Sequence, residues 1–148
     1  MSASNAQTTT APALPPWPYD ALSYVALPAT GDEGFPQVFL LQLEGTVYRV
    51  TMAVYYPDPD FVLNPTYANT VFDLPDPVRG LYLNLRLEYE SQPDATRLIG
   101  AQRVVLDIPI ALGSLVFRFT RIRIAQANLT GSGSFGSELI AQVAVSNA

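Results

Sequence analysis

The sequence predicts an all-β protein: a small antiparallel barrel or sandwich of about six strands, preceded by an extended N-terminal arm. Apolar and polar residues alternate from Leu81 to Tyr89, and a period of two places the apolar residues on one face of a strand. Several other segments repeat this alternation, and none shows an apolar stripe with the 3.6-residue period of a helix. With 148 residues, 49% of them hydrophobic, the chain is long enough to form one domain with a substantial core.

Residues 1–36 form the predicted arm, and residues 37–148 form the predicted single β domain. Six of the 13 prolines lie in the arm. Because proline fixes φ and lacks a backbone donor, we expect this segment to be extended. Its apolar side chains, among them Trp17, Tyr19 and Tyr24, need a surface to cover them. The arm's own domain and a neighbouring subunit are both open as that surface, and plain disorder is the third alternative.

The β domain is predicted to open with a hairpin. Apolar residues alternate along residues 37–43 and again along residues 48–56. Between them, Glu44 and Gly45 fit a tight turn, because glycine readily adopts positive φ. Residues 57–79 contain too many prolines for a helix or a central strand, so we predict a long connection there.

The rest of the domain is predicted to add four strands. We expect them at residues 81–90, 97–110, 115–125 and 139–145, with a hairpin turn at 91–96 and a flexible loop at 131–137. In the third of these strands the apolar positions change parity, from Leu115, Phe117 and Phe119 to Ile122 and Ile124. One extra residue near Thr120 restores a single apolar face, so we predict a β-bulge there.

Composition excludes several kinds of chemistry. The chain has no histidine, cysteine or lysine, and all eight of its basic residues are arginine. Histidine- or cysteine-dependent catalysis, Schiff-base chemistry and the usual zinc sites are therefore excluded. A net charge of −5 argues against nucleic acid as a partner. The sequence shows neither an apolar run of membrane-spanning length nor a secretory signal, and we expect no membrane partner.

Carboxylates offer two possible sites, and a plainer interpretation is favoured for each. Glu88 and Glu90 share a strand face, and such a pair could serve a glycosidase, but both end a strand before a polar turn, as at a solvated edge. Four loop carboxylates could offer oxygens to Ca²⁺: Asp58, Asp60, Asp73 and Asp76. Aspartate beside proline is ordinary turn chemistry, so no metal or cofactor is predicted.

Aromatic and arginine side chains point instead to contacts. Five aromatic residues lie in or next to the long connection: Tyr55, Tyr56, Phe61, Tyr67 and Phe72. They could form a carbohydrate-binding platform, cover the core or contact another subunit. Five arginines could form a patch if their strands pair: Arg97, Arg103, Arg118, Arg121 and Arg123. Pairing with Asp107, Glu88 or the acidic surface of a partner is favoured for them, because the guanidinium group makes bidentate bonds.

The order of these features resembles the baseplate plug family of contractile-tail phages. The resemblance is carried by four segments: Leu43–Val50, Met52–Tyr56, Gly80–Leu87 and Gly100–Val105. It implies a structural protein of the virion near the axis of the tail baseplate, synthesised in the host cytoplasm. It also implies packing against hub or tail-tube subunits within a symmetric oligomeric assembly, and it supplies no catalytic residues.

We therefore predict a structural baseplate component that is not an enzyme. The alternative is a non-catalytic carbohydrate-binding β module. The residues expected to contact partners are Trp17, Tyr19, Tyr24, Tyr55, Tyr56, Phe61, Tyr67, Tyr82 and Arg86.

Overall fold

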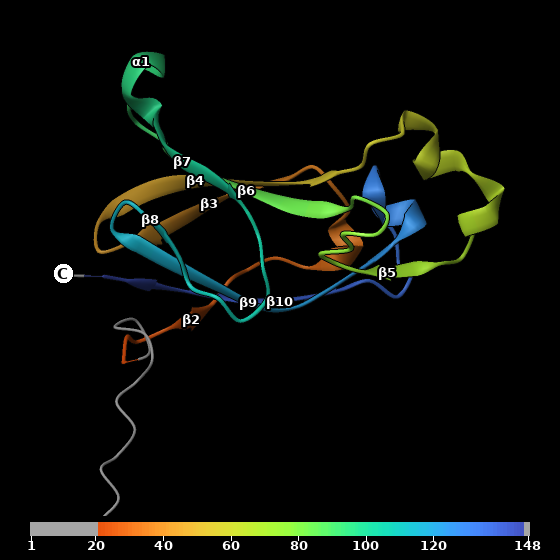
Figure 1. Cartoon of the computed structure of the whole chain (residues 1–148). Helices are drawn as coiled ribbons and strands as arrows, with labels where there is room; N and C mark the ends of the chain where they lie inside the picture. Colours follow the sequence, from red (N-terminus) through yellow and green to blue (C-terminus); the bar gives the residue numbers. More distant parts are fainter. Residues whose placement is uncertain (1–20, 147–148) are drawn as a thin grey trace, which may run out of the picture.

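The structure is a computed structural model that describes residues 21–146, and this part of the chain forms two antiparallel β-sheets packed as a sandwich (Figure 1). One sheet has four strands in the order β3 (Gln37–Leu43), β4 (Thr46–Tyr55), β6 (Tyr82–Tyr89) and β7 (Leu98–Arg103). The other has five: β2 (Val25–Ala26), β10 (Glu138–Val145), β9 (Leu115–Ala125), β5 (Val71–Asp73), and β8 (Ile110–Leu112) paired with β9. The predicted all-β class is confirmed, and three short strands, β2, β5 and β8, add to the six expected.

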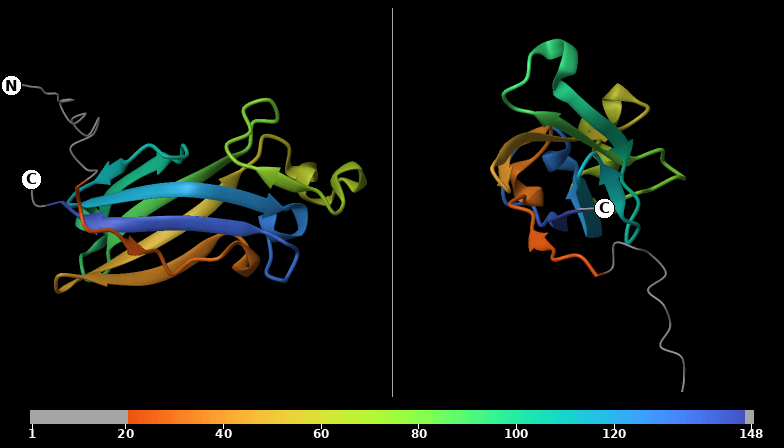
Figure 2. Two further views of the ribbon diagram at one scale, coloured as in Figure 1. Left: turned by 90° about the horizontal axis from the view of Figure 1, so that it is seen from below. Right: turned by 90° about the vertical axis from the view of Figure 1, so that its left-hand side faces the viewer.

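Short helices occupy some of the connections. They are η1 (Gly31–Glu33), η2 (Pro59–Leu63), η3 (Pro65–Tyr67), α1 (Asp94–Arg97) and η4 (Gln126–Leu129). Figure 2 shows the long strands running along the sandwich, with the α1 turn projecting beyond the sheets. Among residues 21–146, no helix has the length and apolar character needed to cross a membrane.

The core lies between the two sheets. On β6 the leucine side chains at 83, 85 and 87 are 0% exposed, while the side chains between them point outward, as the alternation predicts. From the facing sheet, Phe117 and Phe119 of β9 are also fully buried. Burying one such side chain contributes roughly 1.5–3 kcal/mol relative to leaving it in water.

Two local predictions are confirmed in detail. Glu44 and Gly45 both have positive φ (49° and 83°), and the β3–β4 ladder closes on them with Leu43 opposite Thr46. In the β9–β10 ladder, Arg121 lies opposite Ile140 and Phe119 opposite Ala141. The residue between, Thr120, has no partner in the register and is the extra residue of the predicted bulge.

The predicted strand at residues 97–110 is wrong in its extent. Arg97, expected to begin this strand, is instead the last residue of the single helical turn α1. The rest of α1 lies in residues 91–96, where a plain hairpin turn was expected. The ladder then stops at Arg103, and the chain crosses to the other sheet, where Ile110 begins β8. Asp107 adopts a φ of 65° at this crossing and donates its N–H to the carbonyl of Phe119 at 2.8 Å. The chain turns here from one sheet to the other, although apolar residues continue to alternate along this part of the sequence. The alternation alone therefore predicts one long strand.

The second half of the expected arm packs on the sandwich. Residues 21–36 supply β2, which pairs with β10, and the Leu27 N–H donates to the carbonyl of Ala141 at 2.9 Å. Leu27 and Phe35 are buried in the common core. Two expected contact residues of the arm, Trp17 and Tyr19, lie outside the described residues.

The glycine- and serine-rich segment at residues 131–137, expected to be a flexible loop, is held by hydrogen bonds to a buried asparagine. The amide nitrogen of Asn128 donates to the carbonyls of Gly131 and Gly133, both at 3.1 Å. The amide oxygen accepts from the Ser137 hydroxyl at 2.6 Å. These hydrogen bonds to the Asn128 side chain restrain a loop whose composition alone predicts flexibility.

Candidate interaction surface

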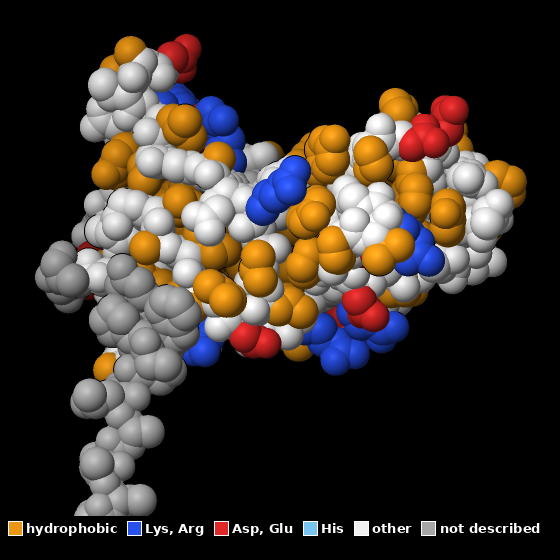
Figure 3. All heavy atoms as spheres, in the orientation of Figure 1, with side chains coloured by type: hydrophobic (Ala, Val, Ile, Leu, Met, Phe, Trp, Pro, Cys, Tyr) orange, Lys and Arg blue, Asp and Glu red, His pale blue; other side chains and the backbone are white. Residues whose placement is uncertain are grey.

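The side chains of the four-stranded sheet that point away from the core form a surface that we call the outer face. Its members are Val38, Leu40, Gln42, Arg49, Thr51, Ala53, Tyr55, Tyr82, Asn84, Arg86, Glu88, Ala101 and Arg103. Val38, Leu40 and Tyr55 are each about half exposed (56%, 55% and 47%). The sheet lies between two projections, the α1 turn and the η2–η3 segment, and the outline of the molecule dips between them (Figures 1 and 3). Three of the predicted contact residues, Tyr55, Tyr82 and Arg86, lie on this face.

An aromatic pair with an arginine marks one end of the outer face. Tyr55 and Tyr82 lie directly opposite one another on β4 and β6. The guanidinium carbon of Arg103 lies 4.1 Å from the ring centroid of Tyr82 and 5.9 Å from that of Tyr55. Each such cation–π contact contributes about 0.5–1 kcal/mol at an exposed site. Tyrosine and arginine are the residue types enriched at protein interfaces, so this cluster has the composition of a contact site.

Arginine side chains engage both carboxylates that the sequence analysis considered for catalysis. The Glu88 carboxylate lies 3.6 Å from the Arg86 guanidinium. The Glu90 carboxylate lies 2.8 Å from Arg49 and 3.6 Å from Arg97. The two acids are thus held by separate cations, an arrangement that favours ion pairing over a shared catalytic role.

The aromatic residues of the long connection pack on each other. Phe61 stacks on Tyr67 with ring centroids 4.6 Å apart and contacts Phe72 at 5.1 Å. Phe61 and Phe72 are only 7% and 3% exposed. Tyr56 packs, partly buried, against the same core. Phe61, one of the expected contact residues, is therefore buried rather than on the surface, because the connection folds around it. The core-covering interpretation fits this group.

Three of the four aspartates of this connection have separate local partners. Asp58 accepts from the N–H of Asp60 at the start of η2, and Asp73 pairs with Arg123 at 3.0 Å. Asp76 pairs with Arg79 at 2.8 Å. Across residues 21–146, no three His, Cys, Asp or Glu side chains gather as a metal site requires.

Asp76 gives the connection a pH-dependent contribution to stability. Burial raises the pKa of this carboxyl, but hydrogen bonds from the Arg79 side chain and backbone, together with the Arg79 charge, lower it below its ordinary value of 3.8. A carboxyl with a lowered folded-state pKa stabilises the protein above its unfolded-state pKa, and this contribution is lost as the pH falls through the folded-state pKa.

We therefore expect Asp76→Asn to lower the free energy of unfolding at neutral pH, with the difference from wild type shrinking below pH 3.8. Urea unfolding across this pH range measures the difference. Glu33→Gln, at an exposed position, is the control and should give a smaller difference. A deficit for Asp76→Asn that stays constant down to the lowest pH would contradict the ion-pair explanation.

The five arginines considered as one patch are divided between the two sheets. Arg97 and Arg103 lie beside or on β7, whereas the other three lie on β9 in the other sheet. Arg121 pairs with Glu138 at 2.6 Å and Arg123 with Asp73 at 3.0 Å, rather than with Asp107 or Glu88. The condition for a single patch is not met, because β7 and β9 do not pair, and Arg121 and Arg123 pair with carboxylates other than the two expected.

Comparisons of this chain with protein-family models, with curated proteins and with solved structures find no match. The assignment of the outer face as a contact surface therefore depends on its geometry alone. Sequence reasoning missed Arg103 as the partner of the two tyrosines. Val38 and Leu40 are apolar although they alternate with the core-facing residues of their strand, and this doubly apolar pattern was the available signal of a contact surface.

Proposed function

We propose that this protein is a non-catalytic structural component that assembles with other proteins through the outer face. The observation that carries the proposal is the solvent-accessible Tyr55–Tyr82–Arg103 cluster on the outer face, which also presents the half-exposed Val38 and Leu40. Interfaces bury aromatic and arginine anchors of this kind. The lack of histidine, cysteine and lysine in the whole chain fits the same role.

The assembly that we propose is the baseplate of a contractile phage tail, with hub or tail-tube subunits as partners in a symmetric oligomer. Support comes from where the resembling segments lie. Leu43–Val50 and Met52–Tyr56 belong to the β3–β4 hairpin and its end, Gly80–Leu87 contains most of β6, and Gly100–Val105 contains the end of β7. The resemblance therefore concerns the sheet that presents the outer face.

The test places a charge at the centre of the outer face. Ala53 lies between Thr51 and Tyr55 and opposite Asn84, so Ala53→Glu introduces a carboxylate where an interface would desolvate it. We expect this variant to be at least about tenfold depleted from purified tail particles, measured by quantitative mass spectrometry. Val78→Glu is the control, because Val78 is 94% exposed in the connection before β6 and lies off the outer face.

Each result decides a separate part of the proposal. Absence of the wild-type protein from tail particles would overturn the baseplate assignment. Equal incorporation of Ala53→Glu and Val78→Glu would overturn the outer face as the contact surface. Circular dichroism of the two purified variants establishes that both are folded, so that depletion reports on assembly.

A carbohydrate-binding module is the second candidate, and the 47% exposure of Tyr55 favours it. Sugar rings stack on exposed aromatic faces, but Arg103 already lies over Tyr82, and Phe61 and Tyr67 stack on each other inside the connection. A glycan array probed with the purified protein distinguishes the candidates. Binding that disappears in Tyr55→Ala would support the module, and no binding would leave the structural role.

A further inference from the structure

Strand β3 presents an open hydrogen-bonding edge. In a hairpin closed by a two-residue turn, the residues flanking the turn form a hydrogen-bonded pair, here Leu43 and Thr46. Hydrogen-bonded pairs recur at every second position, so the odd-numbered residues of β3 bond to β4. The hydrogen bond from the Glu90 N–H to the Val47 carbonyl supports this assignment. It shows that the odd-numbered residues of β4 bond toward β6, which leaves the even-numbered residues of β4 to bond to β3. The backbone groups of Val38, Leu40 and Gln42 therefore face away from the sheet.

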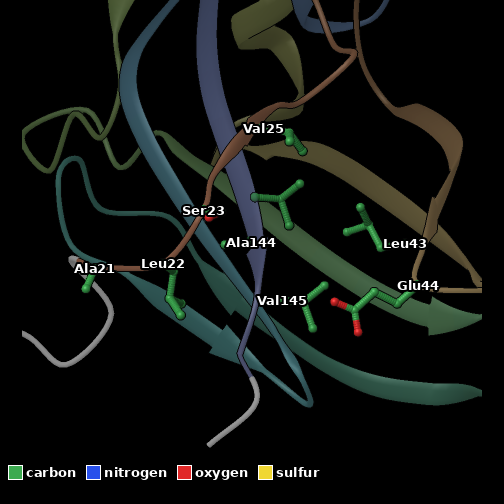
Figure 4. Close-up of a pocket in the computed structure, with 9 residues that line it drawn as sticks. Ala21, Leu22, Ser23, Val25, Leu43, Glu44, Ala144 and Val145 are labelled. Carbon is green, nitrogen blue, oxygen red and sulfur yellow. The ribbon is translucent and has the colours of Figure 1, made fainter.

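No other described strand pairs with this edge. β3 is the last strand in the order of its sheet, and β2, which precedes it in the chain, pairs with β10 instead. The gap between these elements is a groove of about 410 Å³ at the end of β3, lined in part by Leu43, Val25 and Val145 (Figure 4). The two sheets consequently do not close on each other along β3.

The edge also lacks the features that protect edge strands from pairing. Exposed edges are usually kept short or blunted by charge, proline or a bulge. The seven residues of β3 include no charged residue, no proline and no glycine, and their register with β4 is unbroken. The edge strand β7 carries Arg103, and β5 has three residues and ends on Asp73. Val38 and Leu40, whose backbone groups are unpaired, are also more than half exposed.

We propose that β3 pairs with β3 of a second copy of this chain, so that two four-stranded sheets become one continuous sheet. Another strand can form hydrogen bonds with the free N–H and C=O groups along this edge. An antiparallel pair of identical strands is related by a two-fold axis, so each strand offers the donors and acceptors that the other needs. It places Leu40 opposite Leu40 and Val38 opposite Gln42, without juxtaposed charges. The chain's own proline-rich segment at residues 12–18 is a poor alternative, because four of its residues lack the N–H donor.

The first test is the association state of the full chain in solution, and it does not depend on the baseplate proposal. Sedimentation velocity over a range of concentrations is expected to show a reversible dimer for wild type. Leu40→Lys should raise its dissociation constant by about tenfold or more, because two lysines then meet on the two-fold axis. Ile140→Lys is the matched control: Ile140 is 54% exposed, against 55% for Leu40, but lies on β10 in the other sheet.

The second test reads the backbone of the wild-type protein directly. Amide hydrogen exchange resolved by residue should show protection at Val38, Leu40 and Gln42 that increases with protein concentration. The amides of Phe39 and Leu41, already bonded to β4, should change far less. A wild-type monomer at all concentrations would overturn the proposal. So would equal effects of Leu40→Lys and Ile140→Lys, or dimerisation without added protection at the three amides.

Discussion

Replacing Gly34 with alanine is expected to destabilise the fold by about 3 kcal/mol or more. Gly34 follows η1 with a φ of 76°, a conformation that costs an L-residue with a side chain roughly 1–2 kcal/mol. A Cβ at this position would also overlap the carbonyl oxygen of Gly131. This oxygen accepts a hydrogen bond from Asn128, so it cannot retreat without breaking that contact.

Gly45→Ala separates the two contributions. Gly45 has nearly the same φ, 83°, but nothing lies within 4 Å of where its Cβ would be. We expect Gly45→Ala to lower the free energy of unfolding only by the cost of positive φ for alanine, about 1 kcal/mol. Chemical denaturation of both variants measures the difference. Equal losses would mean that the approach of the η1 segment to the Gly131 loop does not constrain the fold.

Features that depend on neighbours in the sequence were predictable. The bulge at Thr120 follows from a change of parity within one strand, and the β3–β4 turn follows from Glu44-Gly45 between two alternating segments. The crossing after Arg103 was missed because apolar residues continue to alternate while the chain changes sheets. At the crossing, the Asp107 N–H donates to the carbonyl of Phe119, a contact that the alternation of residues 97–110 does not reveal.

The same distinction between local pattern and long-range contact applies to the residues of the candidate surface. The outward direction of Tyr82 and Arg86 follows from alternation with the buried leucines of β6, and the sequence predicts it. The position of Arg103 over Tyr82 depends on the register between β6 and β7, which the sequence does not reveal. Phe61 was assigned to the surface because an aromatic residue between prolines gives no sign of a connection that folds back around it.

The second large effect is expected for Asn128→Ala. Asn128 is 0% exposed, and its amide bonds to the 131–137 loop and to the Asp32 carbonyl, the last at 3.4 Å. Alanine would leave the carbonyls of Gly131 and Gly133 and the hydroxyl of Ser137 without this partner. Leaving a buried polar group unsatisfied costs about 1–3 kcal/mol, so we expect a loss of about 3 kcal/mol in the free energy of unfolding.

Two further variants show whether that loss comes from the hydrogen bonds. Ser137→Ala removes one member of the network and should cost about 1 kcal/mol. Asn84→Ala, on the outer face, should change stability by no more than about 0.5 kcal/mol. Because Asn128 and Ser137 share a hydrogen bond, the double variant should lose less than the sum of the single losses. Strict additivity, or a loss for Asn128→Ala no larger than for Asn84→Ala, would show that the loop is held by its backbone contacts rather than by this side chain.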